Sequence, residues 1–280
     1  MPSQSDRPLL VIDGDNFAHR AYHAVPKTVR RENGKGGGAI LGFTNTLMRL
    51  YQMVQPRAVV VGWDKLDVPT YRHKELPGYQ AGRVFDKSLL EQLEMLPELP
   101  TACGFVSAKA GGYEADDFVA TAVAAEEERG GTAVVASGDR DMFQLASNQT
   151  AILHPVKGGE LVPIGPAEVR ERYGVEPHQV PDFIALRGDP SDKIPGAKGV
   201  GAVGAASLLS RYPSLEAALQ EGKFAAQADE LRLYRRVATM DTSAPLPPIE
   251  DQTPTWDKGA ALVREWGLPR LADKLKELAG

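Results

Sequence analysis

Three short apolar runs in this chain each lead directly to an aspartate. They are Leu9-Leu10-Val11-Ile12-Asp13, Val59-Val60-Val61-Gly62-Trp63-Asp64 and Ala133-Val134-Val135-Ala136-Ser137-Gly138-Asp139. Runs that are apolar throughout, and not only at alternate positions, are typical of parallel strands covered by helices on both faces. Open sheets of this kind bind ligands outside the carboxyl ends of their strands. We therefore expect Asp13, Asp64 and Asp139 to converge on one crevice.

Helical patterns separate these strands. The spacing predicts helices near 39–54, 88–96 and 114–129, short strands near 104–107 and 150–154, and a hairpin around Gly158-Gly159. From residue 166 the pattern is helical with Gly and Pro interruptions, an extended connector at Pro245-Leu246-Pro247-Pro248 and a last helix near 258–278. Alternating strands and helices predict an α/β fold with a three-layer parallel-sheet core over 1–170, followed by a helical subdomain over 171–280.

Further carboxylates cluster near the ends of the predicted elements: Glu114, Asp116 and Asp117, then Asp141, then Asp189 and Asp192. Each alone has an ordinary structural explanation, because acids favour helix N-termini and turns. Crowded together they repel one another, so a folded chain tolerates them best around a cation, and carboxylate oxygens prefer Mg²⁺ or Mn²⁺. Two such ions about 4 Å apart promote phosphodiester hydrolysis. The pattern therefore predicts two-metal phosphoryl chemistry.

The segment that follows Asp64 is both basic and aromatic. Arg72, Lys74, Arg83 and Lys87 alternate there with Tyr71, Tyr79 and Phe85. Basic groups contact phosphates and aromatic rings stack on unpaired bases. A solvated loop is the plainer alternative, but the position directly after Asp64 favours function. Arg20 and Tyr22 should lie beside the same crevice, and the glycines predict that residues 65–90 are mobile in the free protein.

A glycine motif at residues 199–204 matches G-x-G-x-x-G, the dinucleotide-binding pattern. It does not follow a predicted strand, and Glu221, the acid about twenty residues later, falls at the end of a helix. A helix–hairpin–helix over about 177–211 is the better interpretation. Its glycines, Gly199 and Gly201, would let backbone amides approach a duplex phosphate, and Lys193 and Lys198 add positive charge.

The amino-acid composition favours one kind of cellular compartment and is only weak evidence against a nucleic-acid partner. The net charge is −5, but the nine carboxylates named above are candidate metal ligands, and setting them aside leaves a positive balance. The single cysteine, Cys103, rules out an intrachain disulfide and favours a reducing compartment. Residues 1–8 lack a signal-peptide core and no stretch is long enough to span a membrane. We expect a cytoplasmic monomer.

These motifs resemble the 5′-nuclease (flap endonuclease) family, and most of all the 5′→3′ exonuclease domains of bacterial DNA polymerase I. The chain stops where a polymerase would begin, so we expect a free-standing nuclease or a piece of a longer protein. The matching stretches are Val11-Ile12-Asp13-Gly14, Trp63-Asp64, Tyr71-Arg72-His73, Gly78-Tyr79-Gln80-Ala81-Gly82-Arg83, Gly112-Tyr113-Glu114-Ala115-Asp116-Asp117, Ser137-Gly138-Asp139-Arg140-Asp141 and Gly188-Asp189-Pro190-Ser191-Asp192-Lys193-Ile194-Pro195-Gly196-Ala197-Lys198-Gly199-Val200-Gly201.

The resemblance implies a PIN-like or resolvase-like core, a helical arch at about 65–100 and a helix–hairpin–helix (H3TH) subdomain. One metal would be held by Asp13, Asp64, Glu114, Asp116 and Asp117, and a second would involve Asp139, Asp141, Asp189 and Asp192. Two or three Mg²⁺ or Mn²⁺ ions are implied, with K⁺ a candidate at the hairpin. The resemblance also implies catalytic roles for Arg20, Arg72 and Arg83. Residues implied to contact DNA are Arg20, Tyr22, Arg72, Lys74, Tyr79, Gln80, Arg83, Lys87, Lys193, Lys198, Gly199 and Gly201.

The implied activity is 5′→3′ exonucleolytic and 5′-flap endonucleolytic hydrolysis of DNA, acting on flaps, overhangs, nicks or RNA/DNA primers in primer removal and repair. Three departures affect this expectation. Gln80 stands where the family usually has Lys, Val203-Gly204-Ala205 replaces a usual Lys-Thr-Ala after the hairpin, and Lys193 replaces a common Asn. The alternatives are a flap- or junction-binding module with weak or lost catalysis, which Gln80 motivates, and a PIN-type RNase, which the hairpin disfavours.

Overall fold

The computed structural model describes residues 7–279, which form two compact units. Unit 1 contains the chain up to residue 65, residues 84–138 and the chain from residue 242. Unit 2 contains residues 66–83 and 139–241. Because the chain enters each unit more than once, each is described by itself.

A parallel sheet forms the centre of unit 1. Its strands are β1 (Leu9–Asp13), β2 (Ala58–Gly62), β3 (Val106–Ala108) and β4 (Ala133–Ala136), hydrogen-bonded in the order β3-β2-β1-β4. Every residue of β1 and β2 is buried, as their uniformly apolar sequences predict. The register pairs Asp13 with Gly62, and Ile12 with Ala136, so the carboxyl ends of these three strands are aligned.

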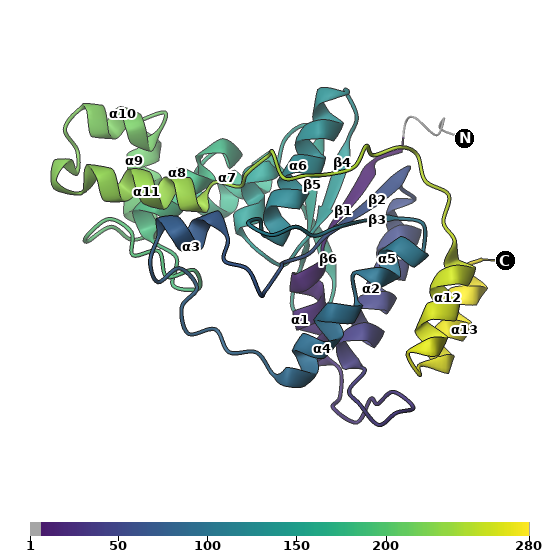
Figure 1. The fold of residues 1–280 in the computed structure, drawn as a ribbon. Coiled ribbons are helices and arrows are strands. Elements are labelled where there is room, and N and C mark those ends of the chain that lie inside the picture. Colours follow the sequence, from purple (N-terminus) through teal and green to yellow (C-terminus); the bar gives the residue numbers. More distant parts are fainter. Residues whose placement is uncertain (1–6, 280) are drawn as a thin grey trace. The chain divides into compact units, whose positions relative to one another are not determined.

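Helices cover both faces of this sheet (Figure 1). A Cβ on Gly62 would lie 2.6 Å from the Ala115 carbonyl oxygen of α6 (Ala115–Glu128), so that position faces α6. The next residue, Trp63, packs against Phe43 of α2 (Gly38–Val54), with ring centroids 5.0 Å apart. Successive residues of an extended chain point to opposite faces. The three-layer α/β prediction is therefore confirmed, with α1 (Gly14–Ala24) packed against α2.

The other helices of unit 1 are α4 (Lys87–Met95), α5 (Glu98–Ala102), α12 (Trp256–Glu265) and α13 (Pro269–Glu277). Gln92 on α4 accepts hydrogen bonds from the backbone amides of Ala39 and Ile40, and so caps α2, whose own N-cap Gly37 has no side chain. The single last helix predicted near 258–278 is wrong. The chain breaks at Gly267, whose φ is 80°, and α13 begins at Pro269, which has no amide hydrogen to continue a helix.

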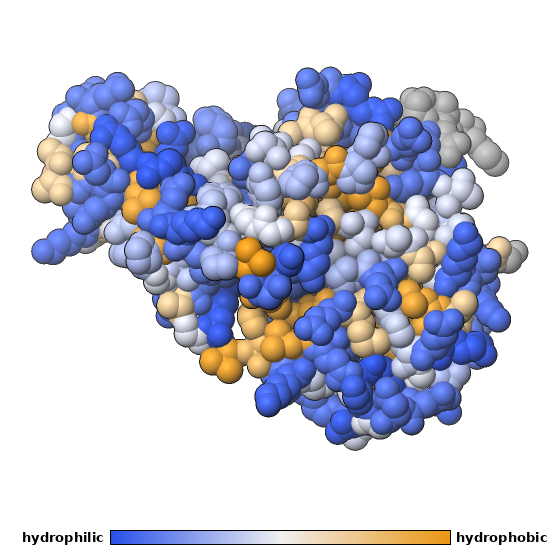
Figure 2. All heavy atoms as spheres, in the orientation of Figure 1, coloured by the Kyte–Doolittle hydropathy of each residue, from blue (hydrophilic) through white to orange (hydrophobic). Residues whose placement is uncertain are grey.

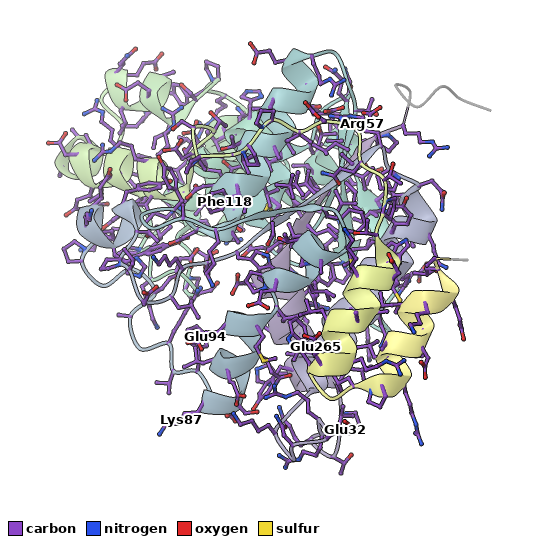
Figure 3. The ribbon with its side chains drawn as sticks, turned by 45° about the vertical axis from the view of Figure 1, so that its right-hand side comes forward. Glu32, Arg57, Lys87, Glu94, Phe118 and Glu265 are labelled. Atoms are coloured by element: carbon purple, nitrogen blue, oxygen red, sulfur yellow. The ribbon has the colours of Figure 1, made fainter. Side chains whose placement is uncertain are left out.

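Within unit 1, a buried ion pair holds the extended connector 242–255 against the sheet and α6. Arg57 and Glu126 pair side by side, with 3.0 Å between Nε and Oε1, and both are almost fully buried. Arg57 also donates to the Ile249 carbonyl at 3.2 Å and to Asp251 at 3.1 Å, both on the connector. Figure 3 shows Arg57 beside this segment, just before β2. One guanidinium therefore joins the sheet, α6 and the connector.

Unit 2 is mainly helical. It contains α3 (Tyr71–Glu75), α7 (Pro166–Tyr173), α8 (Val180–Arg187), α9 (Ala202–Leu209), α10 (Leu215–Gln220) and α11 (Ala228–Ala238). It also holds the antiparallel hairpin β5 (Thr150–Pro155) and β6 (Leu161–Ile164), and the 3-10 turns η2 (Asp141–Leu145), η3 (Pro177–Gln179) and η4 (Ala225–Gln227). Helix α8 packs against α9 and α11. Figure 2 shows hydrophilic residues over much of α10 and α11, where Arg232 and Glu216 pair.

The turn between α8 and α9 has the form expected of a helix–hairpin–helix. Asp189 and Ile194 exchange two backbone hydrogen bonds of 2.8 Å and close the hairpin. Gly196 has a φ of 80°, and a Cβ there would lie 2.5 Å from the Gly188 nitrogen, so only glycine fits. Gly201 is the N-cap of α9 and has no atoms within 4 Å of where a Cβ would stand. The backbone there is open to an approaching ligand.

Candidate metal centre and nucleic-acid interface

Asp13 is the last residue of β1 and the N-cap of α1, and it is 4% exposed. Its Oδ1 accepts from the Asn16 amide at 3.0 Å, and its Oδ2 accepts from the Ser137 hydroxyl at 2.7 Å. Ser137 directly follows β4. Both oxygens are thus oriented by neighbours, and the carboxylate is fixed at the ends of two adjacent strands.

Asp64 is tied to Asp15 and to the start of α6. Its backbone amide donates to Oδ2 of Asp15 at 2.7 Å, and its own Oδ1 accepts from the Ala115 amide at 2.7 Å. Asp15 is buried, at 7% exposure. The first two predicted strand-end acids therefore belong to one unit, where a third acid, the buried Asp15, contacts Asp64.

The acids at the start of α6 differ in exposure and role. Glu114 is the N-cap and not a first-turn residue as predicted, because α6 begins at Ala115. Its amide donates to Oδ2 of Asp117 at 3.0 Å, and Asp117 is fully buried. Asp116 is partly exposed. Glu114 and Asp117 form a reciprocal cap, so part of their hydrogen-bonding capacity serves the helix.

The second predicted set lies entirely in unit 2. Oδ1 of Asp139 accepts from the Asp141 amide at 3.1 Å. Asp189 is buried, and its Oδ1 accepts from the Ser191 amide at 2.8 Å and the Ser191 hydroxyl at 2.5 Å. Its Oδ2 lies 3.3 Å from Arg187. Asp189 therefore shapes the hairpin turn that carries Asp192.

Burial and repulsion raise the pKa values of Asp15, which lies beside the first set, and of two acids in the second set. Burial raises the pKa of Asp15 well above its ordinary value, and the neighbouring Asp64 and Asp13 raise it further. The pKa of Asp141 is likewise raised well above its usual range by burial, then by Asp139, Asp192 and Asp189. Burial also raises the pKa of Asp192 to about 6, although Arg83 opposes this shift. Asp15 and Asp141 are therefore buried beside other carboxylates that repel their negative charge.

The donor chemistry fits a hard divalent cation. Both sets offer carboxylate oxygens, the ligands that Mg²⁺ and Mn²⁺ prefer. As the side chains stand, no three His, Cys, Asp or Glu residues within 7–279 are close enough together to hold one ion. The candidate ligands are therefore grouped and under-compensated, but they are not arranged as a formed coordination shell.

The predicted DNA contacts divide into buried and exposed residues. Arg72 is 3% exposed and donates to the Val237 carbonyl at 2.9 Å. Tyr22 and Tyr79 are also buried, so their rings are not open to stack on a base in this structure. The exposed predicted contacts are Arg20, Lys74, Arg83, Lys87, Lys193, Lys198, Gly199 and Gly201.

Gln80 and Arg83 both contact Asp192. The Nε2 of Gln80 lies 3.0 Å from Oδ1 of Asp192, and Nη2 of Arg83 lies 2.9 Å from the same oxygen. The backbone amide of Gln80 donates to the Asp192 carbonyl at 3.2 Å. The residue that departs from the family pattern is therefore bound to a candidate metal ligand.

Sequence reasoning missed Asp15, Ser137 and Asn16. Asn16 accepts from the Gly138 amide at 3.0 Å and so connects the start of α1 to the end of β4. The available signal was the spacing Asp13-Gly14-Asp15-Asn16 directly after a buried strand. An acid in the first turn of a helix is ordinarily explained by the helix dipole, and for that reason Asp15 attracts no attention in the sequence.

Two adjoining family models match the chain. The 5′-3′ exonuclease N-terminal resolvase-like domain matches residues 8–174, and the 5′-3′ exonuclease C-terminal SAM fold matches residues 175–258. The chain belongs to the 5′-3′ exonuclease family. This confirms the resemblance found in the motifs, and the two models describe a resolvase-like α/β domain followed by a helical SAM-fold domain.

Relatives and solved structures agree with this family. The DNA polymerase I of Mycobacterium tuberculosis is 37% identical over 210 residues, 74% of this chain and 23% of the polymerase. The thermostable DNA polymerase I of Thermus thermophilus is 35% identical over 249 residues, 85% of this chain and 29% of that protein. This chain thus spans under a third of the length of these curated relatives.

Structural neighbours share the fold at low sequence identity. The T5 5′-exonuclease with bound zinc ions has a TM-score of 0.68 at 20% identity, covering 98% of this chain and 100% of that one. The catalytic core of Rad2 in complex with DNA substrate has a TM-score of 0.61 at 14% identity, covering 98% of this chain and 93% of that one.

In the described part of this chain, no helix is both long and apolar enough to cross a membrane.

Proposed function

We propose that this protein hydrolyses DNA phosphodiester bonds in the presence of Mg²⁺ or Mn²⁺, exonucleolytically from 5′ ends and endonucleolytically at 5′ flaps. The observation that carries the proposal is the group of acids at the carboxyl ends of β1 and β2. Asp13 ends β1, Asp15 accepts from the Asp64 amide, and Asp64 accepts from the Ala115 amide at the start of α6. Family membership and DNA-bound neighbours such as Rad2 support it.

Each unit would contribute one carboxylate set to cation binding. In unit 1 the proposed ligands are Asp13, Asp64, Glu114, Asp116 and Asp117. In unit 2 they are Asp139, Asp141, Asp189 and Asp192. Divalent cations bound there would supply an activated water and neutralise charge on the phosphodiester. The raised pKa values of Asp141 and Asp192 in the second set, and of Asp15 beside the first, support this role, because a bound cation would offset the repulsion that each acid experiences from its neighbours.

The remaining residues would hold the substrate. Lys193 and Lys198 are exposed on the hairpin, where Gly199 and Gly201 leave the backbone accessible to a duplex phosphate. K⁺ is a candidate ion there. Arg20 and Lys74 are exposed and suited to phosphate contacts. Arg72, Tyr22 and Tyr79 would serve the 5′ strand only after leaving their buried positions.

The test is cleavage of an end-labelled 5′-flap DNA by the full chain with EDTA, Mg²⁺ or Mn²⁺. We expect metal-dependent cutting at the flap junction, together with mononucleotide release from recessed 5′ ends. Asp116→Asn should abolish cutting while leaving flap binding intact, because it removes a proposed ligand that is partly exposed. Asp257→Asn, an exposed acid in the first turn of α12, is the matched control and should cut like wild type. Cleavage by Asp116→Asn at the wild-type rate would reject its assignment.

The same assay separates the two alternatives. A junction-binding module is motivated by Gln80, which stands where the family usually has a lysine and donates a hydrogen bond to Asp192. It would bind the flap tightly without cutting in either metal. A PIN-type RNase would cut an RNA flap and spare the DNA flap. RNA-primer removal and repair are the proposed roles, and an RNA-initiated flap on DNA tests the first of them.

A further inference from the structure

Asp192 is engaged by two residues from segment 66–83. Its Oδ1 accepts from Nε2 of Gln80 at 3.0 Å and from Nη2 of Arg83 at 2.9 Å. A carboxylate oxygen offers its lone pairs either to hydrogen-bond donors or to a cation. An amide and a guanidinium thus occupy Oδ1, and a cation that binds this oxygen must displace at least one of them.

The backbone around Gln80 is shaped for this contact. Gln80 has a φ of 51°, a left-handed conformation that is uncommon for a residue with a side chain. Its Nε2 also donates to the Tyr79 hydroxyl at 2.9 Å, so one amide group bridges Tyr79 and Asp192. Tyr79 itself is buried, with its ring 5.2 Å from that of His73. Several independent contacts therefore place Gln80 on Asp192.

The start of the same segment is anchored elsewhere in unit 2. Arg72 is buried and donates to the Val237 carbonyl at the end of α11. Glu75 pairs with Arg236 of α11 at 3.2 Å, and both side chains are exposed, Arg236 by 60% and Glu75 by 38%. These contacts hold α3 without involving Asp192. The contacts of Gln80 and Arg83 with Asp192 could therefore compete with a metal ion. The contacts of α3 with α11 could not.

We propose that Gln80 and Arg83 are positioning residues for Asp192 whose contact excludes a divalent cation from Oδ1. A cation that binds through Oδ1 of Asp192 then competes with docking of residues 78–83. Loading this set releases Gln80 and Arg83, and segment 78–83 becomes free to meet the 5′ strand. This inference rests on the proposed function, because it takes Asp192 to be a metal ligand.

The test is Mn²⁺ binding by the full chain, followed by electron paramagnetic resonance, with the second set identified as binding lost in Asp141→Asn. Arg83→Ala and Gln80→Ala should each bind Mn²⁺ more tightly than wild type, by up to about fivefold, the range of a partly exposed ion pair. Arg236→Ala is the matched control, since it removes an ion pair of the same segment that does not touch Asp192. It should bind Mn²⁺ as wild type does.

Amide hydrogen exchange provides a readout that does not depend on affinity. Mg²⁺ should speed exchange at the Gln80 amide, which donates to the Asp192 carbonyl, and the Arg83→Ala protein should already exchange fast there without Mg²⁺. Equal Mn²⁺ affinity in all variants, with no effect of Mg²⁺ on exchange, would overturn the positioning role and leave metal-dependent cleavage standing. Absence of Mn²⁺ binding by wild type and by both variants would overturn the positioning role and the proposed function together.

Discussion

Asp15 accepts a hydrogen bond from the backbone amide of Asp64 at 2.7 Å, and so fixes the turn that follows β2. Partners that orient metal ligands typically contribute 10–100-fold to metal affinity or activity. We therefore predict that Asp15→Ala lowers flap cleavage about tenfold or more, through weaker metal binding. The measurement is the cleavage rate as a function of Mg²⁺ concentration.

The Asp15→Asn variant separates orientation from charge. Asparagine keeps an oxygen that can accept from the Asp64 amide, but it carries no negative charge. If Asp15 acts by positioning Asp64, Asp15→Asn should retain most of the Mg²⁺ affinity that Asp15→Ala loses. Equal losses in the two variants would show instead that the charge of Asp15 is what the site requires.

At the scale of elements, the Arg57–Glu126 pair joins α6 to the start of β2 and to the connector 242–255. Removing one partner of a buried ion pair costs about 3–5 kcal/mol when it leaves the other charge uncompensated. Because Arg57 keeps its pair with Asp251, we predict that the free energy of unfolding of Glu126→Gln, measured with denaturant, falls by more than about 1 kcal/mol but by no more than this range. Arg264→Ala, which breaks an exposed pair with Asp273, should cost under about 1 kcal/mol. A similar small loss in Glu126→Gln would show that Asp251 alone compensates the charge of Arg57.

The glycines of the hairpin provide a second prediction, because alanine at two of them should affect different properties, stability at Gly196 and duplex binding at Gly201. Gly196→Ala places a Cβ 2.5 Å from the Gly188 nitrogen at a φ of 80°, so it should destabilise unit 2 by about 2 kcal/mol or more. Gly201→Ala meets no protein atom within 4 Å and should barely change stability. It should weaken duplex binding, because its methyl group occupies space that a phosphate would enter.

Thermal denaturation and fluorescence anisotropy with a duplex at fixed salt measure the two effects. The expected result is a lower melting temperature for Gly196→Ala, and a weaker duplex affinity with an unchanged melting temperature for Gly201→Ala. Wild-type duplex affinity in Gly201→Ala would argue that this part of the hairpin does not face DNA.

Elements with a uniform pattern were predictable from the sequence. Strands β1 and β2 are apolar at nearly every position, and buried parallel strands need nothing else. The break between α12 and α13 was missed because their apolar periodicity continues across Gly267. The docking of Arg72 could not be predicted, since its partner Val237 is 165 residues away and the contact uses a backbone carbonyl, which carries no sequence signal.

At the scale of the whole molecule, the chain contributes one acidic set to each of two units although it carries a net charge of −5. The motifs predicted which acids matter, because strand ends and short acidic clusters are visible in the sequence. They did not predict that residues 66–83 would join the unit of Asp139–Asp192, because that grouping depends on contacts distant in sequence, such as that of Gln80 with Asp192.

If both sets bind divalent cations, Mg²⁺ should stabilise the folded protein beyond its effect as a salt. A ligand that binds only the folded state, at ten times its dissociation constant, stabilises it by about 1.4 kcal/mol. We predict that saturating Mg²⁺ raises the melting temperature by a few degrees relative to NaCl of equal ionic strength. Screening of surface charges would act equally in both salts, so the difference between them measures bound ions.

Variants in each unit locate this stabilisation. Asp64→Asn should remove the part that arises in unit 1, and Asp141→Asn the part that arises in unit 2, because each loses one carboxylate from a single set. The double variant should then melt at the same temperature in Mg²⁺ and in matched NaCl. If it keeps the full Mg²⁺ effect, the ions bind outside these carboxylates, and the assignment of both sets fails together.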